Sequence, residues 1–168
     1  MINKFYNILE KILIILLVSL LSLMILLIFS QVFFRYILNN PLSWAEELSR
    51  HMMIWSVFIG AAIAYRNNSH MGIDLIYGVL PKEIGKFLMS FTHFGILLFS
   101  LFLLFKGYEI SEKTMGQLSS ALRIKMGYIY IAIPIGFAMI AMFSVEHIIN
   151  LWAEKINCQK KQTKVSNL

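Results

Sequence analysis

Residues 12–34 read ILIILLVSLLSLMILLIFSQVFF, and this stretch decides the class of fold. It contains no Asp, Glu, Lys or Arg. A helix that crosses the hydrocarbon core of a bilayer needs about 20 mostly apolar residues, and this stretch supplies them alone. It is too long for the apolar part of a secretory signal, and no small-residue cleavage site follows it. We therefore expect residues 12–34 to form a first membrane-spanning helix that the protein retains.

Three further stretches lack charged residues, and two of them are long enough to span a bilayer. The other one, residues 52–65, is too short, so its helix must begin in the charged sequence before it. Ser43-Trp44-Ala45-Glu46, directly after Pro41, predicts a capping box that starts a helix at Ser43. We therefore predict an all-α integral membrane protein with four transmembrane helices. The expected spans are about 12–34, 43–65, 84–106 and 126–148.

The composition agrees with a membrane protein and excludes other classes. Hydrophobic residues make up 58% of the 168 residues and charged residues only 14%, whereas a soluble domain has about 25% charged residues. The single cysteine, Cys158, excludes an internal disulfide framework and a cysteine-based zinc site. The net charge of +6 comes from residues between and after the apolar runs, a pattern typical of membrane topology and not of nucleic-acid binding.

The distribution of Lys and Arg predicts the orientation. Four spans place both chain ends on one side, and more Lys and Arg fall on that side than on the other. By the positive-inside rule we expect an N-in, C-in topology. We further expect one membrane domain over residues 1–152 and a basic, disordered cytoplasmic tail over 153–168. Residues 1–11 and 73–80 are expected to be short interfacial helical segments.

Small residues predict where helices approach closely. Ser56, Gly60 and Ala64 are spaced four apart and share one face of the second span, which is a small-xxx-small pattern. We expect this face to pack against another helix, in this chain or in a partner.

Catalytic, metal and cofactor sites have weak support in the sequence. Among residues within the spans only His93 is ionisable and deep, and the carboxylates lie at span ends. His93 and His147 both lie toward the inner side but at different expected depths, which disfavours bis-histidine haem. No enzyme motif is present. We expect no catalytic residue, metal or cofactor, and keep a b-type cytochrome anchor and a stand-alone exporter as alternatives.

Polar residues gather at the expected outer face. Glu46 and Arg50 are i,i+4 partners, and Glu47 precedes His51 by the same spacing. The residues alone leave two readings open, surface salt bridges at headgroup level or a docking surface for another subunit. The candidate interface residues here are Gln31, Arg35, Trp44, Glu46, Glu47, Arg50 and Trp55.

Five short segments, taken in order, resemble a known family. They are QVFFRY (31–36), NPLSWAEEL (40–48), IW (54–55), FIGAA (58–62) and HMGID (70–74). This set resembles the small, DctQ-like membrane subunit of tripartite ATP-independent periplasmic (TRAP) transporters, and the resemblance extends over residues 12–152. It adds Asp74 to the candidate interface. Arg123 and Lys125 depart from the family, which often has Gly and Pro there.

The resemblance implies a division of labour among subunits. In such systems a periplasmic substrate-binding protein captures an organic acid, such as a dicarboxylate, sugar acid or sialic acid. A large multi-span permease subunit carries it inward by an elevator-type movement driven by a sodium gradient. The small subunit would be a static, non-catalytic scaffold in the bacterial inner membrane. Its partners would be the large permease, the periplasmic protein at the outer face, and membrane lipids, with no nucleic acid.

Overall fold

The structure is a computed structural model. It describes the backbone of residues 2–68 and 82–166 and the side chains of residues 6–67, 85 and 88–150. Every named element in these ranges is helical, so the predicted all-α class is confirmed. The elements are α1 (Ile2–Tyr36), α2 (Ser43–Asn68), α4 (Lys82–Lys113), the 3-10 turn η1 (Thr114–Gly116), α5 (Gly127–Tyr130) and α6 (Ala132–Ser166).

Four helices are long and apolar enough to cross a membrane, as predicted. The candidate spans are Tyr6–Tyr36, Ser43–Asn67, Leu88–Gly116 and Gly127–Asn150. They contain 31, 25, 29 and 24 residues, so each exceeds the roughly 20 residues that a bilayer requires. The last span comprises α5 and most of α6, which meet at Ile131. Pro134 lacks the N–H that would bond to the carbonyl of Tyr130, which explains the break between these two helices.

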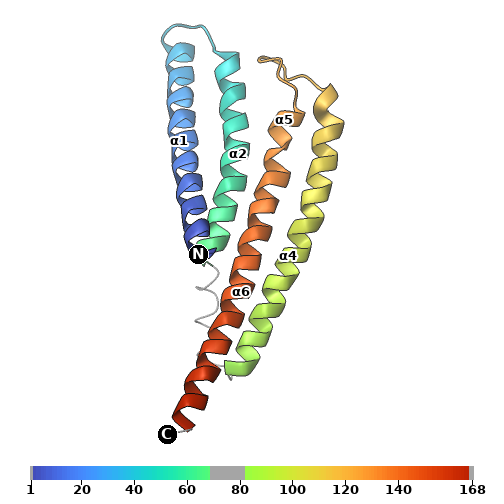
Figure 1. Cartoon of the computed structure of the whole chain (residues 1–168). Helices are drawn as coiled ribbons and strands as arrows, with labels where there is room; N and C mark the ends of the chain where they lie inside the picture. The colour runs from blue at the N-terminus through green and yellow to red at the C-terminus, as the bar shows by residue number, and fades with distance from the viewer. Residues whose placement is uncertain (1, 69–81, 167–168) are drawn as a thin grey trace.

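The helices form an open row. The main contacts are between α1 and α2, between α2 and α6, and between α6 and α4. Figure 1 shows the pair α1 and α2 beside the pair α4 and α6. The turn between α1 and α2 and the turn between α4 and α5 lie at the same end. We call this the loop end, and the opposite end, where α1 begins and α2 finishes, the termini end. There α4 and α6 reach further than α1 and α2 (Figure 1).

The hydrophobic core is small and joins three helices. Its fully buried members come from α1, α2 and α6: Leu13, Ile59, Ala62, Ile63 and Phe143. Most other apolar side chains on α1 and α4 are exposed in the isolated chain. Only 6% of the most apolar window of the first span is buried inside the chain. Such a surface requires lipid or a partner around it.

Three glycines permit the closest helix contacts. A Cβ on Gly136 would lie 2.7 Å from Cβ of Phe58, at the contact of α2 and α6. A Cβ on Gly107 would lie 2.7 Å from Cγ2 of Ile133, at the contact of α4 and α6. These distances leave no room for a side chain. Gly127 is equally confined, against the carbonyl oxygen of Ser111.

The structure differs from the sequence-based expectation at three helix ends. The Leu42 carbonyl accepts the N–H groups of Ala45 and Glu46, and the Glu46 carboxylate binds neighbouring side chains instead of closing a capping box with Ser43. The segment 1–11, expected to be interfacial, continues α1 without a break from Ile2. The segment 73–80 lies outside the described residues.

The last helix, α6, extends to Ser166. Residues 153–166 contain neither Gly nor Pro, the two residues that most disfavour a helix. The disorder expected for this basic tail stays a prediction.

A short, well-bonded turn connects α4 to α5 at the loop end. We call residues 117–126 the loop hairpin. Leu118 and Lys125 form an antiparallel bridge, and the N–H of Ser119 donates to the carbonyl of Ile124 at 2.9 Å. Arg123 has a φ of 54° in the left-handed region, where a side chain is disfavoured. The hairpin is therefore held in one conformation by its own hydrogen bonds.

Candidate functional site

In the described part of the chain, polar side chains connect different elements at each end of the row. We call Gln31, Glu46, Glu47, Arg50 and His51 the loop cluster. We call Asn7, Glu10, Arg66 and Glu146 the terminal cluster. Sequence analysis identified the first cluster and missed the second. Each cluster connects helices that are far apart in the chain, so both bear on how the row is held together.

The loop cluster connects α1 to α2 through the Glu46 carboxylate. Gln31 Nε2 donates to Oε2 of Glu46 at 3.1 Å, and Arg50 donates to Oε1. The side chains of Arg50 and Glu46 are 71% and 49% exposed. The predicted i,i+4 pair is present, and Gln31 joins it. Exposed pairs of this kind stabilise a fold by less than about 1 kcal/mol.

Glu47 connects α2 to the loop hairpin. Its Oε2 accepts the N–H groups of Ala121 and Leu122, at 2.6 and 3.1 Å. Its Oε1 lies 3.8 Å from Nε2 of His51, and both side chains are largely buried. A carboxylate that receives two successive backbone N–H groups forms a strong, charge-assisted contact. Glu47 therefore fixes the hairpin against the start of α2.

The other predicted interface residues are spread over the surface and core. Arg35 lies 5.9 Å above the ring of Tyr36, at the end of α1. Trp44 is exposed, whereas Trp55 packs against the hydrophobic core. Asp74 lies outside the described residues.

The small-residue face of α2 is only partly covered. Ser56 is buried and donates to the carbonyl of Met52 at 2.8 Å. A Cβ on Gly60 would meet only the methyl groups of Leu17, at 3.8 and 4.0 Å, which is ordinary contact. Ala64 is exposed. The close approach within this chain is thus made by Gly136 and not by Gly60, and the role of the face toward a partner stays a prediction.

Arg66 organises the terminal cluster. Its Nε and Nη2 donate to the two carboxylate oxygens of Glu146, both at 3.0 Å. Nη1 donates to Glu10 and, at 3.0 Å, to the carbonyl of Tyr6, while Nη2 also donates to Oδ1 of Asn7 at 2.6 Å. A guanidinium has five N–H groups, so all of them are used. The side chains of Arg66 and Glu146 are only 9% and 6% exposed.

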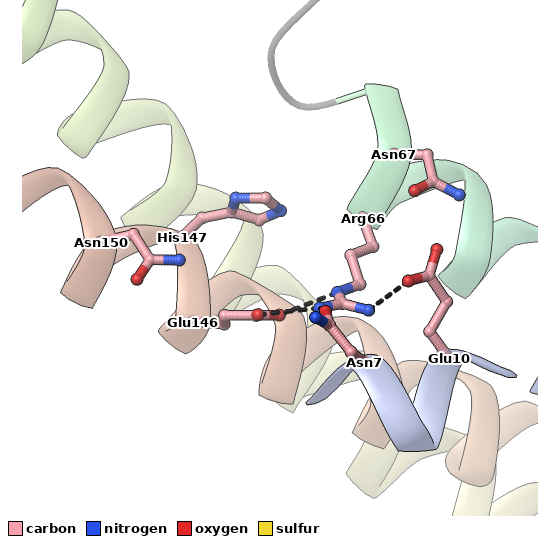
Figure 2. A pocket seen from close by; sticks show the side chains of 7 residues that line it. All are labelled: Asn7, Glu10, Arg66, Asn67, Glu146, His147 and Asn150. Carbon is pink, nitrogen blue, oxygen red and sulfur yellow. Dashed lines mark hydrogen bonds and ion pairs between the residues drawn. The ribbon is translucent and has the colours of Figure 1, made fainter. Parts of the chain in front are cut away.

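A cleft opens beside this cluster, between the start of α1, the end of α2 and α6. Its volume is about 350 Å³. Figure 2 shows Arg66 reaching from α2 to Glu146 on one side and Glu10 on the other, with two asparagines further out. Every lining residue is polar or charged: Asn7, Glu10, Arg66, Asn67, Glu146, His147 and Asn150.

Two histidines meet beside this cleft. The rings of His93 and His147 stack, with centroids 5.2 Å apart and planes at 13°. The hydroxyl of Tyr65 lies 2.8 Å from Nδ1 of His93. The sequence placed the two histidines at different depths, and the structure corrects this because α4 and α6 run past each other at the termini end. In bis-histidine ligation the iron and the haem plane lie between the imidazoles, so directly stacked rings do not fit haem.

The contacts of both clusters hold elements of the row together. Among the described residues no group of three or more His, Cys, Asp or Glu could hold a metal ion. Arg66 has no free donor for an anionic substrate. The signal that could have found the terminal cluster was in the sequence. Glu10, Arg66 and Glu146 each end an apolar run, and antiparallel helices bring those ends together.

Comparison with known proteins gives one consistent answer. Residues 24–154 match the family described as tripartite ATP-independent periplasmic transporters, DctQ component. A TRAP transporter small permease protein of Haemophilus influenzae is 27% identical over 151 residues, which cover 89% of this chain and 93% of that protein. The sialic acid TRAP transporter small permease protein SiaQ of Vibrio cholerae is 25% identical, with 90% and 86% covered.

A third relative is much longer than this chain. It is the sialic acid TRAP transporter permease protein SiaT of Haemophilus influenzae, 28% identical over 117 residues. The match covers 70% of this chain but only 19% of SiaT.

Proposed function

Because the chain belongs to the DctQ family of TRAP transporter small permease subunits, we propose that it is the fixed scaffold of a sodium-driven transporter for organic acids. As a family member with four helices able to span a membrane, it is a multi-pass protein of the bacterial inner membrane. The moving parts, the substrate site and the sodium sites would belong to a large permease subunit.

The observation that carries the scaffold role is the fixation of the row at both ends. Arg66 connects α1, α2 and α6 at the termini end, and Glu47 connects α2 to the loop hairpin at the loop end. Between them Gly136 and Phe58 are in tight contact. Interactions of this kind oppose sliding of one helix past another, as a static support for a moving partner requires.

The longer relative supports a large permease partner. In SiaT the region similar to this chain is a small part of one permease protein. A domain that is fused to a much larger membrane protein in one case is expected to bind a separate one in another. The exposed apolar sides of α1 and α4 offer area for such contact in addition to lipid.

The substrate class rests on the relatives. Two similar proteins are named for sialic acid and one for C4-dicarboxylate. All of these are organic acids, so we propose an organic acid for this system. We also propose that the loop end faces the periplasm and contacts the substrate-binding protein, since most of the loop hairpin and the pair of Glu46 with Arg50 are exposed there.

The decisive experiment reconstitutes transport from parts. The tagged chain is purified from native membranes in mild detergent, the co-purifying proteins are identified, and uptake into liposomes is measured with and without a sodium gradient. We expect a large multi-span permease to co-purify. We expect uptake only when that subunit, the binding protein and an inward sodium gradient are all present.

Two outcomes would contradict this proposal. Uptake by the chain alone would make it an exporter or carrier in its own right. Equal uptake without this chain would remove any need for a scaffold. A matched pair of variants sharpens the result: Arg66→Met should lower uptake through loss of the scaffold, while Lys11→Met, which removes an exposed cation of α1, should not.

A further inference from the structure

The cleft beside the terminal cluster could bind a ligand, which the proposed scaffold role does not require. Its volume of about 350 Å³ is many times the roughly 30 Å³ share of one water molecule. It is lined entirely by polar and charged residues, in a chain that is 58% hydrophobic. A cleft of this size and polarity has room for a polar ligand as well as for water.

The charge of the lining selects a cation. Arg66 gives all five of its N–H groups to Glu146, Glu10, Asn7 and the Tyr6 carbonyl. It therefore has no donor left for a phosphate or a carboxylate. Among the described residues that line the cleft, one guanidinium, that of Arg66, faces the two carboxylates of Glu10 and Glu146.

The acceptors favour an ammonium over a metal ion. No group of three or more His, Cys, Asp or Glu in the described part of the chain could hold a metal ion. Among the described residues, the Glu10 carboxylate accepts a hydrogen bond only at Oε2, and its side chain is 19% exposed. Asn67 and Asn150 add amide oxygens to the lining. A primary ammonium has three N–H donors and no acceptor, which matches a carboxylate and two amides.

The depth of the cleft indicates where the ammonium comes from. The stretches of α1, α2 and α6 that lack Asp, Glu, Lys and Arg end beside the lining residues, at positions 12, 65 and 145. The cleft therefore lies where the hydrocarbon core meets the headgroups. We propose that it binds a primary ammonium group, the chemistry that an ethanolamine phospholipid presents at this depth and that a free small amine shares. The bound headgroup would add a counter-charge to the terminal cluster and tighten it.

Lipid competition measured by native mass spectrometry tests the proposal. The full-length chain, with any subunit that co-purifies, is delipidated and offered equal amounts of phosphatidylethanolamine and phosphatidylcholine with the same acyl chains. The choline headgroup has the same charge but no N–H donor. We expect about tenfold more bound ethanolamine lipid, and a higher unfolding midpoint in its presence.

Three variants locate the site. Glu10→Gln removes one carboxylate charge while keeping an acceptor for Arg66, and Asn150→Leu removes an amide without touching any Arg66 bond. Both should abolish the preference for ethanolamine lipid. Glu112→Gln, an exposed carboxyl near the loop end, should leave it unchanged. Unfolding midpoints of all three variants show that they are folded.

Each outcome has a defined meaning. Equal binding of the two lipids, or preferential binding of phosphatidylcholine, would overturn the proposal. So would a preference for ethanolamine lipid that survives both cleft variants. Millimolar free ethanolamine that displaces the lipid would confirm the ammonium chemistry and assign a soluble amine as a second ligand. Because these measurements do not require transport, their outcome is independent of the outcome for the scaffold proposal.

Discussion

The two polar clusters resemble each other in composition but differ in burial. Each centres on a glutamate–arginine pair, Glu46 with Arg50 at the loop end and Glu146 with Arg66 at the termini end. The first pair is 49% and 71% exposed, and the second is 6% and 9% exposed. The first pair joins residues one helical turn apart, whereas the second joins residues 80 positions apart.

This difference in burial indicates which charged pairs contribute most to the stability of the chain. An exposed pair on one helix is screened by water and constrains little. A buried pair is costly to desolvate, but the loss of one partner leaves an unpaired charge inside the protein. We therefore expect the terminal cluster to determine the stability of the chain, and the loop cluster to determine what the outer surface presents.

The largest effect should follow from Arg66→Met. This change leaves Glu10 and Glu146 without a counter-charge, which costs about 3 kcal/mol for a buried pair. We expect a markedly lower midpoint in thermal unfolding of the purified chain in detergent. Arg50→Met is the matched control and should change the midpoint little. Equal shifts for the two variants would show that burial does not distinguish the clusters.

Packing between the clusters should give the next effect. Gly136→Leu places a side chain where a Cβ alone would lie 2.7 Å from Phe58, and overpacking of this kind costs about 2 kcal/mol. Gly60→Leu, where a Cβ meets only Leu17 at 3.8 Å, should leave the chain stable. If Gly60→Leu nevertheless weakens co-purification of the large subunit, the Ser56–Gly60–Ala64 face binds that partner. Loss of stability in Gly60→Leu would contradict the packing described here.

A local effect should follow from Glu47→Gln. The neutral side chain is a weaker acceptor for the N–H groups of Ala121 and Leu122. We expect faster hydrogen–deuterium exchange in the loop hairpin and unchanged exchange in the core of α2. Unchanged exchange at both amides would mean that the hairpin is held by its own bonds alone.

The smallest effect on stability should come from Glu46→Lys. It breaks an exposed pair, so we expect a change under about 1 kcal/mol in the free energy of unfolding. The variant also tests docking, because reversing a charge on a docking surface should change the affinity for the partner. We expect weaker binding of the periplasmic protein at low salt and a smaller difference at high salt. Binding that is unaffected at both salt concentrations would leave Glu46 as an ordinary surface charge.

Helix number and approximate position could be predicted from the sequence because they follow from apolar run length and, for the second span, from the start signal at Pro41 and Ser43. The stretch 12–34 and the pair Glu46–Arg50 were found in this way, the second because i,i+4 spacing is local. The pairing of Arg66 with Glu146 could not be found from spacing, since it depends on which helices are neighbours. The same holds for Glu47, whose partners are backbone N–H groups of the loop hairpin, and for the contact of His93 with His147.

The unequal lengths of the uncharged stretches have a consequence for the surrounding bilayer. At 1.5 Å per residue the stretch 12–34 of α1 is roughly 34 Å long, whereas the stretch 52–65 of α2 is roughly 21 Å long. The hydrocarbon core is about 30 Å thick, so the hydrophobic mismatch is largest along α2, whose first turns carry charged residues. Lipids beside α2 must thin, or water must reach its charged turns, and thinning of the bilayer stores elastic energy. Covering this helix with a partner subunit releases that energy, so bilayer deformation itself favours assembly.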